Sequence, residues 1–105
     1  MDKFILQGKV AVPATPHEWA KWYETAERHV GKVEKDGVMV STVFLGLNHA
    51  WEPNEPPKLF ETMIFGGEHD QYQERCSTWG EAEIMHKTAC ALAWPDAAQE
   101  QGEKK

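Results

Sequence analysis

A chain of 105 residues with a formal net charge of −6 has room for one hydrophobic core and little room for a separate catalytic module. The negative charge argues against a surface that neutralises phosphates, because non-specific nucleic-acid binding depends on clustered lysine and arginine. Hydrophobic residues make up 41% of the chain, which is ordinary for a soluble globular protein, whereas five tryptophans are many for this length. We therefore expect a single domain over residues 1–94, no nucleic-acid partner, and large aromatic side chains available for a core or an interface.

Alternating apolar residues and turn signals predict five strands. Gly8 suits the tight turn of a first hairpin, and Asp36 followed by Gly37 marks a second one. The strand at 38–47 is apolar on both faces, so we expect it in the middle of its sheet. Glu61 is the one charged residue inside the strand predicted to pair beside it. The predicted strands are residues 4–6, 9–12, 32–34, 38–47 and 59–65.

Two helix starts carry the same signal, a threonine followed three residues later by a glutamate. This is the spacing of a capping box, in which the threonine hydroxyl accepts from a backbone N–H of the first turn and the glutamate accepts from the backbone N–H of the threonine. The two pairs are Thr15 with Glu18 and Thr78 with Glu81. Apolar residues at helical spacing extend the first helix to Val30, with Gly31 as its stop. The second helix is expected to run to about Trp94, where Pro95 ends it.

These elements predict an α+β fold of two layers. We expect an antiparallel sheet with two helices packed on one face, in a ββα-ββα-like order. Residues 68–77 are predicted to be a polar loop, and residues 95–105 a disordered tail because they contain no strong apolar residue. An exposed sheet edge or the opposite sheet face offers a surface for a homodimer.

Cysteine usage and hydropathy predict a cytoplasmic protein. Cys76 and Cys90 lie fourteen positions apart without the neighbouring Cys or His of a zinc site, so we expect reduced, free thiols, with a disulfide as the alternative. The N-terminal residues lack the basic region and long apolar run of a secretion signal. The apolar runs are also far shorter than the roughly 20 residues that span a bilayer. We therefore expect no membrane association.

The first candidate site is the loop at residues 48–58, which contains three prolines that restrict its conformations. A rigid loop that presents a tryptophan between acidic residues is typical of a protein-binding surface, because aromatic anchors contribute most at interface centres. The alternative is that Trp51 folds back as a lid on the sheet. The candidate binding residues are Asn48, His49, Trp51, Glu52 and Glu55.

The second candidate site follows the strand at 59–65 and a Gly66-Gly67 pair. Its members are His69, Asp70, Tyr72 and Arg75. An imidazole beside carboxylates can carry out general acid and base catalysis. Consecutive residues of an extended segment point in different directions, however, so these side chains need not meet at one atom. The alternative is a solvated loop without catalytic function. A nucleophilic role for Cys76 lacks a base, although a nearby helix N-terminus favours a thiolate.

The five histidines do not predict a metal site. No pair has the i, i+4 spacing that supplies two ligands from one helix face. If the strands at 38–47 and 59–65 are antiparallel, His49 and His69 lie at opposite ends of the sheet. His86 falls within the second helix and is expected to be partly buried with a backbone or carboxylate partner, a ligand or catalytic role being the alternative. We expect neither a metal nor a cofactor.

Three segments carry a family resemblance. They read Val-Ser-Thr-Val-Phe-Leu-Gly at 40–46, Leu-Phe-Glu-Thr-Met-Ile-Phe-Gly-Gly at 59–67, and Thr-Trp-Gly-Glu-Ala onward from 78 to 86. The chain resembles small uncharacterised proteins of tailed-phage and prophage genomes over roughly residues 19–86. The resemblance implies phage origin and an accessory role in the host cytoplasm, and it assigns no functional residues. Cys76 departs from the pattern, in which an aromatic residue is more usual.

Two functions follow as hypotheses. The first is a non-enzymatic accessory protein that binds a host or phage protein through the Trp51 loop and an acidic surface, with a homodimer as an option that the exposed sheet edge offers. The alternative is a small-ligand binder or a metal-assisted hydrolase that uses His49 or His69 with neighbouring carboxylates. Because no catalytic motif stands out, the sequence leans away from an enzyme.

Overall fold

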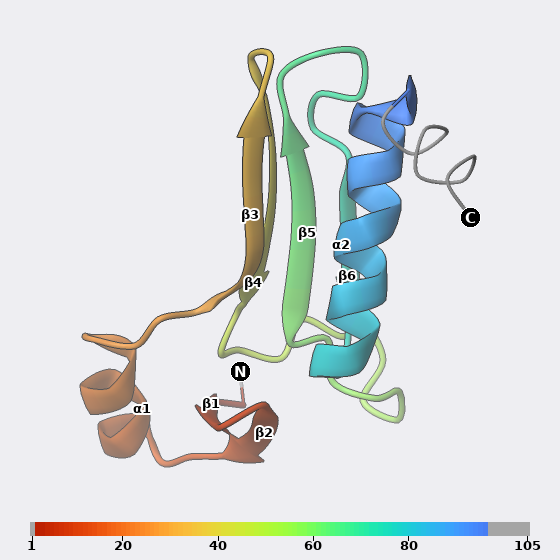
Figure 1. Cartoon of the computed structure of the whole chain (residues 1–105). Helices are drawn as coiled ribbons and strands as arrows, with labels where there is room; N and C mark the ends of the chain where they lie inside the picture. The colour runs from red at the N-terminus through yellow and green to blue at the C-terminus, as the bar shows by residue number, and fades with distance from the viewer. Residues whose placement is uncertain (1, 97–105) are drawn as a thin grey trace.

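Two antiparallel sheets and two helices make up the protein, in a computed structural model that describes residues 2–96 (Figure 1). The elements in chain order are β1 (Phe4–Gln7), β2 (Val10–Pro13), α1 (Pro16–Tyr23), β3 (His29–Lys35), β4 (Val38–Phe44), β5 (Phe60–Phe65), β6 (Gln73–Cys76) and α2 (Trp79–Ala93). The first two strands form a hairpin, and the other four form one sheet in the order β3-β4-β5-β6. β4 therefore lies inside its sheet, as its apolar faces predict, and β5 pairs beside it.

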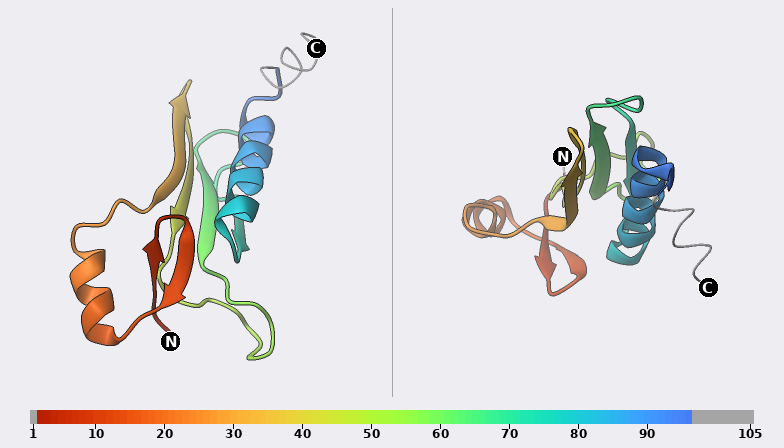
Figure 2. Two further views of the ribbon diagram at one scale, coloured as in Figure 1. Left: turned by 60° about the horizontal axis from the view of Figure 1, so that its bottom comes forward. Right: turned by 45° about the horizontal axis from the view of Figure 1, so that its top comes forward.

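The core lies between α2 and one face of the four-stranded sheet, where α2 runs along the strands (Figures 1 and 2). Ala82 and Ala89 are the fully buried residues of α2, and their small side chains let the helix approach the sheet closely. The buried apolar residues contributed by the sheet and its connections are Val40, Phe44, Leu59, Phe60, Ile64 and Cys76. The α+β class and the two-layer arrangement are therefore confirmed.

The structure differs from the expected fold in the place of α1, which packs beside the β1–β2 hairpin at one end of the four-stranded sheet (Figure 2). The Trp22 ring meets the Phe44 ring edge-on at 5.7 Å. The Trp19 indole N–H donates to the Gly46 carbonyl over 3.0 Å. Gly46 has a φ of 78°, and a Cβ there would lie 2.8 Å from Trp19 Nε1. Aromatic contacts at the sheet's end therefore hold α1, and α2 is the helix of residues 2–96 that covers the sheet face.

Several predicted boundaries are wrong. The strand predicted to end at residue 47 ends at Phe44. The first helix ends at Tyr23, because residues 29–35 join the sheet: the Arg28 carbonyl and the Phe44 N–H are hydrogen-bonded at 2.8 Å, and Val30 packs against the core. The expected polar loop at 68–77 contains β6, a short edge strand with only Cys76 buried. The second half of the chain is therefore ββββα. Both capping boxes and the end of α2 before Pro95 are confirmed.

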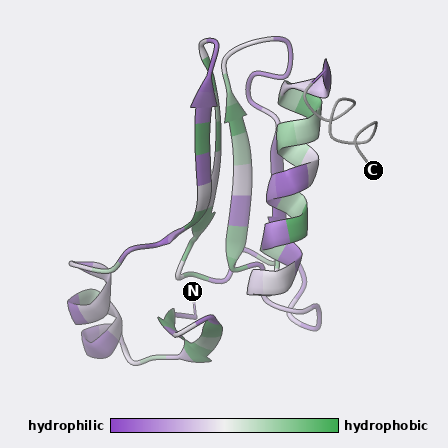
Figure 3. Ribbon diagram, in the orientation of Figure 1, coloured by the Kyte–Doolittle hydropathy of each residue, from purple (hydrophilic) through white to green (hydrophobic). Residues whose placement is uncertain are grey.

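Glu61, the charged residue predicted within β5, has a partner on the sheet face away from α2. β5 is hydrophobic along most of its length, with a hydrophilic band near its start (Figure 3). Glu61 lies opposite Arg75 in the register of β5 and β6, and its Oε2 is 2.9 Å from Arg75 Nε. Gln73 donates to the same carboxylate oxygen. A cross-strand ion pair therefore places a charge in an apolar strand without burying it unpaired.

Within residues 2–96, the helices are too short or too polar to cross a membrane. Cys76 and Cys90 are both free thiols, as expected. Most of the predicted tail, from residue 97 onward, lies outside the described residues.

Candidate functional site

Trp51 is the most exposed large hydrophobic side chain among the described residues, at 93% of its full accessibility. It belongs to the connection between β4 and β5, residues 45–59, which contains the predicted loop at 48–58. An indole at this exposure covers no part of the sheet, so the folded-back alternative is wrong.

Hydrogen bonds within the loop fix its shape although Trp51 itself is exposed. The Asn48 side-chain oxygen accepts from the backbone N–H groups of Ala50 at 2.9 Å and Lys58 at 3.1 Å, which ties the two ends of the loop together. The Trp51 N–H donates to Glu55 Oε1 over 3.1 Å. These bonds explain why the loop needs Asn48 and Glu55, two of the predicted site residues. Both shape the loop from inside rather than extending into solvent.

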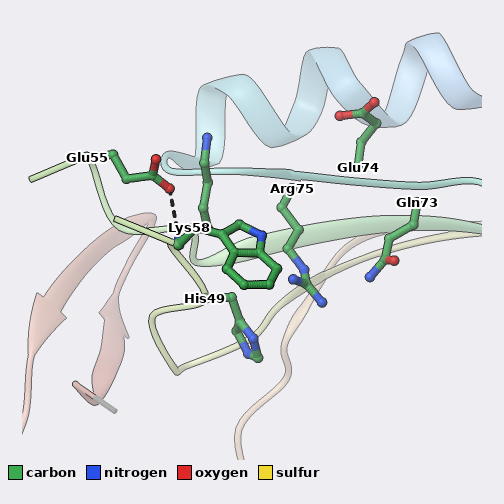
Figure 4. A pocket seen from close by; sticks show the side chains of 7 residues that line it. His49, Glu55, Lys58, Gln73, Glu74 and Arg75 are labelled. Carbon is green, nitrogen blue, oxygen red and sulfur yellow. Dashed lines mark hydrogen bonds between the residues drawn. The ribbon is translucent and has the colours of Figure 1, made fainter. Parts of the chain in front are cut away.

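A shallow hollow of about 250 Å³ lies beside Trp51. Its walls come from the loop and from β6, and they are formed by His49, Trp51, Glu55, Lys58, Gln73, Glu74 and Arg75. In Figure 4 the side chains of His49 and Arg75 approach one another, while Glu74 is directed away from them. The predicted site residues did not include Lys58, which ends the loop, or Gln73 and Glu74, which belong to β6. Residues 73–76 have no apolar alternation that would mark them as a strand.

Charges around the hollow are mixed. Lys58 and Arg75 are cations on its wall, but Arg75 already pairs with Glu61. Glu52 is exposed directly after Trp51, and Glu55 is held by the loop backbone. An exposed indole with an exposed acid beside it is suited to an apolar pocket with a cationic rim on another protein.

The structure divides the second candidate group between different places. His69 and Asp70 follow β5, and Asp70 Oδ1 accepts from the Gly66 N–H over 2.6 Å, which fixes the turn. Tyr72 packs against the core cluster under α2, where burial is the main cause of its raised pKa. Arg75 belongs to the hollow beside Trp51. These four side chains therefore do not converge on one reacting atom.

His86 forms part of a buried hydrogen-bonded chain. Its Nδ1 lies 2.7 Å from the Thr42 hydroxyl, which is 2.5 Å from the Thr62 hydroxyl, and both threonines are fully buried. Cys90 Sγ is 3.8 Å from the other ring nitrogen. Burial lowers the pKa of His86. The prediction of a partly buried histidine is confirmed, but its strongest partner is a threonine hydroxyl rather than a backbone group or a carboxylate.

Histidines and carboxylates do not gather around a possible metal position in the part of the chain that the structure describes. No group of three or more His, Cys, Asp or Glu side chains there could hold a metal ion. His49 comes after β4 and His69 comes after β5. Because these two strands are antiparallel, the two histidines lie at opposite ends of the sheet, as predicted. The ligand or hydrolase alternative stays a prediction.

Cys76 is buried, and burial is the largest cause of a pKa raised to about 11. Glu81 raises the pKa further. Because the thiolate is the reactive form, this environment opposes a nucleophilic role.

A roomier hollow of about 420 Å³ lies between the β1–β2 hairpin and the start of α2. Most of its lining is apolar, with Phe4, Pro57 and Phe60 among the walls. The Lys9 ammonium group is 5.8 Å from the Trp79 ring centroid. No sequence motif indicated this hollow, because its walls come from four separate parts of the chain.

Comparisons with known proteins leave the family open. No protein-family model, curated protein or solved structure matched this chain. The resemblance to phage proteins stays a prediction.

Proposed function

We propose that this protein is a non-enzymatic accessory protein of phage type that acts in the host cytoplasm by binding another protein through the Trp51 loop. One observation carries the proposal: a tryptophan that is 93% exposed stands on a loop whose backbone is held by side chains of the same loop. Large exposed apolar side chains have an unfavourable contact with water, and they are enriched where a partner covers them.

Preorganisation is what makes this loop suited to binding. Ordering a flexible loop on association consumes binding free energy, and a loop that is already ordered avoids that loss. Asn48 joins the two loop ends, and Glu55 holds the backbone at Trp51. Trp51 can therefore enter a partner pocket with little conformational change.

The charges beside Trp51 indicate the partner's chemistry. Glu52 is exposed next to the indole, and the chain as a whole has a net charge of −6. A partner with an apolar pocket bordered by lysine or arginine would match both features. Long-range attraction between an acidic protein and a basic patch also raises the association rate.

The experiment compares Trp51→Ala with Ile84→Ala in capture from a host-cell lysate, followed by affinity measurement with the purified partner. Ile84 is a matched control, because it is also a large exposed hydrophobic residue, at 68%, but lies on α2. Loss of a central aromatic anchor weakens binding by about 2 kcal/mol or more, which is roughly 30-fold in Kd. We expect that loss for Trp51→Ala and wild-type affinity for Ile84→Ala.

Thermal unfolding of both variants separates binding from folding. Substitutions at exposed positions change stability by about 0.5 kcal/mol or less, so both variants should unfold near the wild-type temperature. A partner that binds Trp51→Ala as tightly as the wild type would refute the proposed surface. The absence of any protein captured in preference by the wild type would refute protein binding as the function.

A further inference from the structure

The outer edge of β3 is a second surface with recognition features. β3 pairs with β4 on one side, and within residues 2–96 no strand pairs with its other side. At seven residues it is longer than β6, the four-residue strand at the opposite edge (Figure 1). An unpaired strand edge presents a row of N–H and C=O groups that can bind another strand.

The turn after β3 determines which backbone groups point outward. Asp36 and Gly37 have φ values of 55° and 77°, the conformation of a two-residue type I′ turn. Such a turn is closed by a hydrogen-bonded pair, here Lys35 with Val38. Hydrogen-bonded and non-hydrogen-bonded pairs alternate along two antiparallel strands. Val33 is two positions from Lys35, so its N–H and C=O groups also point toward β4. The N–H and C=O groups of Lys32 and Glu34 therefore point outward from the free edge.

The side chains on this edge combine a partly exposed apolar residue with two opposite charges. Lys32 and Glu34 lie opposite Ser41 and Met39, on the sheet face away from α2. Val33 lies opposite the buried Val40, yet it is 40% exposed. An apolar side chain thus remains partly uncovered between two opposite charges, and the order Lys-Val-Glu becomes Glu-Val-Lys when the strand is read backwards.

We propose that the partner of this edge is a second copy of the chain, paired antiparallel to β3 with a two-fold axis at Val33. In this register Val33 faces Val33 of the second copy, and Lys32 faces Glu34 of the second copy on both sides of the axis. Lys32 and Glu34 are also the residues whose backbone groups point outward, so the same register supplies the hydrogen bonds. The two sheets become one continuous sheet of eight strands.

Charge selects this register over its neighbours. A two-fold axis at Lys32 or at Glu34 would also satisfy the outward backbone groups, but it would place two identical charges directly opposite each other. Opposite charges on facing positions stabilise a strand pair and like charges destabilise it. Charged edge residues usually prevent strand pairing, and here only the Val33-centred register converts them into complementary pairs.

The dimer leaves the Trp51 loop free. The hollow beside Trp51 is walled by β6, the strand at the other edge of the sheet. The two loops of a dimer would therefore lie at the two far edges of the eight-stranded sheet. Such an arrangement presents two copies of the partner-binding loop, but the dimer does not depend on that function, and each proposal can fail alone.

Charge exchange tests the register directly, with the full chain in sedimentation equilibrium. The wild type should reach twice the monomer mass of 12.0 kDa as concentration rises. Lys32→Glu and Glu34→Lys should each weaken the dimer roughly tenfold or more, because each creates two like-charge pairs. An equimolar mixture of the two variants should restore dimers, and so should the double exchange in one chain. Lys21→Glu, an exposed change of the same charge on α1, should leave the dimer unchanged.

A covalent test keeps the proposal falsifiable if charge variants fold poorly. Facing residues of a non-hydrogen-bonded pair have Cα atoms about 4.5 Å apart, which is within disulfide range. Val33→Cys should form a disulfide-linked dimer under mild oxidation, whereas Val10→Cys, at another exposed valine, should not. A wild type that stays monomeric at all concentrations overturns the proposal, and so does a dimer that persists in both charge variants.

Discussion

The buried chain of Thr42, Thr62 and His86 makes a quantitative prediction about stability. The Thr42 hydroxyl is the central member, 2.5 Å from the Thr62 hydroxyl and 2.7 Å from His86 Nδ1. Replacing Thr42 by valine keeps nearly the same shape but leaves both neighbours without this partner. A buried polar group left unsatisfied costs about 1–3 kcal/mol, so we expect Thr42→Val to lower the free energy of unfolding by about 3 kcal/mol.

Thr62 lies at the end of the same chain and should matter less. In Thr62→Val the Thr42 hydroxyl still has His86 as a partner, so the expected loss is one hydrogen bond, about 1 kcal/mol. In the double variant both hydroxyls are gone and only His86 Nδ1 loses its partner. We expect the double variant to lose about 2 kcal/mol, which is less than Thr42→Val alone and far from additive.

Urea unfolding followed by circular dichroism measures these differences, provided that the slope with urea stays at the wild-type value. Thr88→Val is the control, because Thr88 is exposed on α2 and its loss should change stability by no more than about 0.5 kcal/mol. A Thr42→Val variant as stable as this control would refute the stabilising role of the Thr42 hydroxyl. A double variant whose loss equals the sum of the two single losses would refute the hydrogen-bonded chain equally.

Two titratable groups give further predictions. Burial lowers the pKa of His86 below the value of 6.5, so the unfolded chain binds more protons between the two pKa values, and stability should fall as pH decreases below about 6.5. The difference in unfolding free energy between wild type and His86→Gln should therefore shrink as pH falls, and a constant difference would contradict this. Since the thiol of Cys76 has a pKa of about 11, only about one thousandth is thiolate at about pH 8. Iodoacetamide should modify Cys76 far more slowly in the folded chain than in urea, as followed by mass spectrometry, and equal rates would show that the thiol is not protected.

The candidate site was predictable in part. Proline content indicated a loop of restricted shape, but the sequence left open whether Trp51 was exposed or folded back on the sheet, and only the structure shows that it is exposed. The sequence did not indicate that Arg75 would lie beside this loop, because that placement depends on β6 pairing with β5. It also did not indicate that Tyr72, predicted to lie in a polar loop, packs against the core.

Local signals determined the helix starts and one hairpin turn of this fold, because the interactions that create them join residues within four positions. A capping box needs only Thr78 and Glu81, and a type I′ turn needs only the positive φ values that Asp36 and Gly37 adopt. The α+β class followed from such signals. The sequence by itself therefore determined where helices begin and where this hairpin turns.

The tertiary structure decided where elements end and which side chains meet. Residues 24–30 have helical apolar spacing, but α1 ends at Tyr23 because pairing with β4 gives the backbone from His29 onward other hydrogen-bond partners. β6 is a strand because β5 lies beside it, and Glu61 is tolerated because Arg75 lies opposite. The contacts that stabilise these features join residues that are distant in the sequence. A local sequence pattern cannot indicate such a contact, because its two partners come together only when the chain folds.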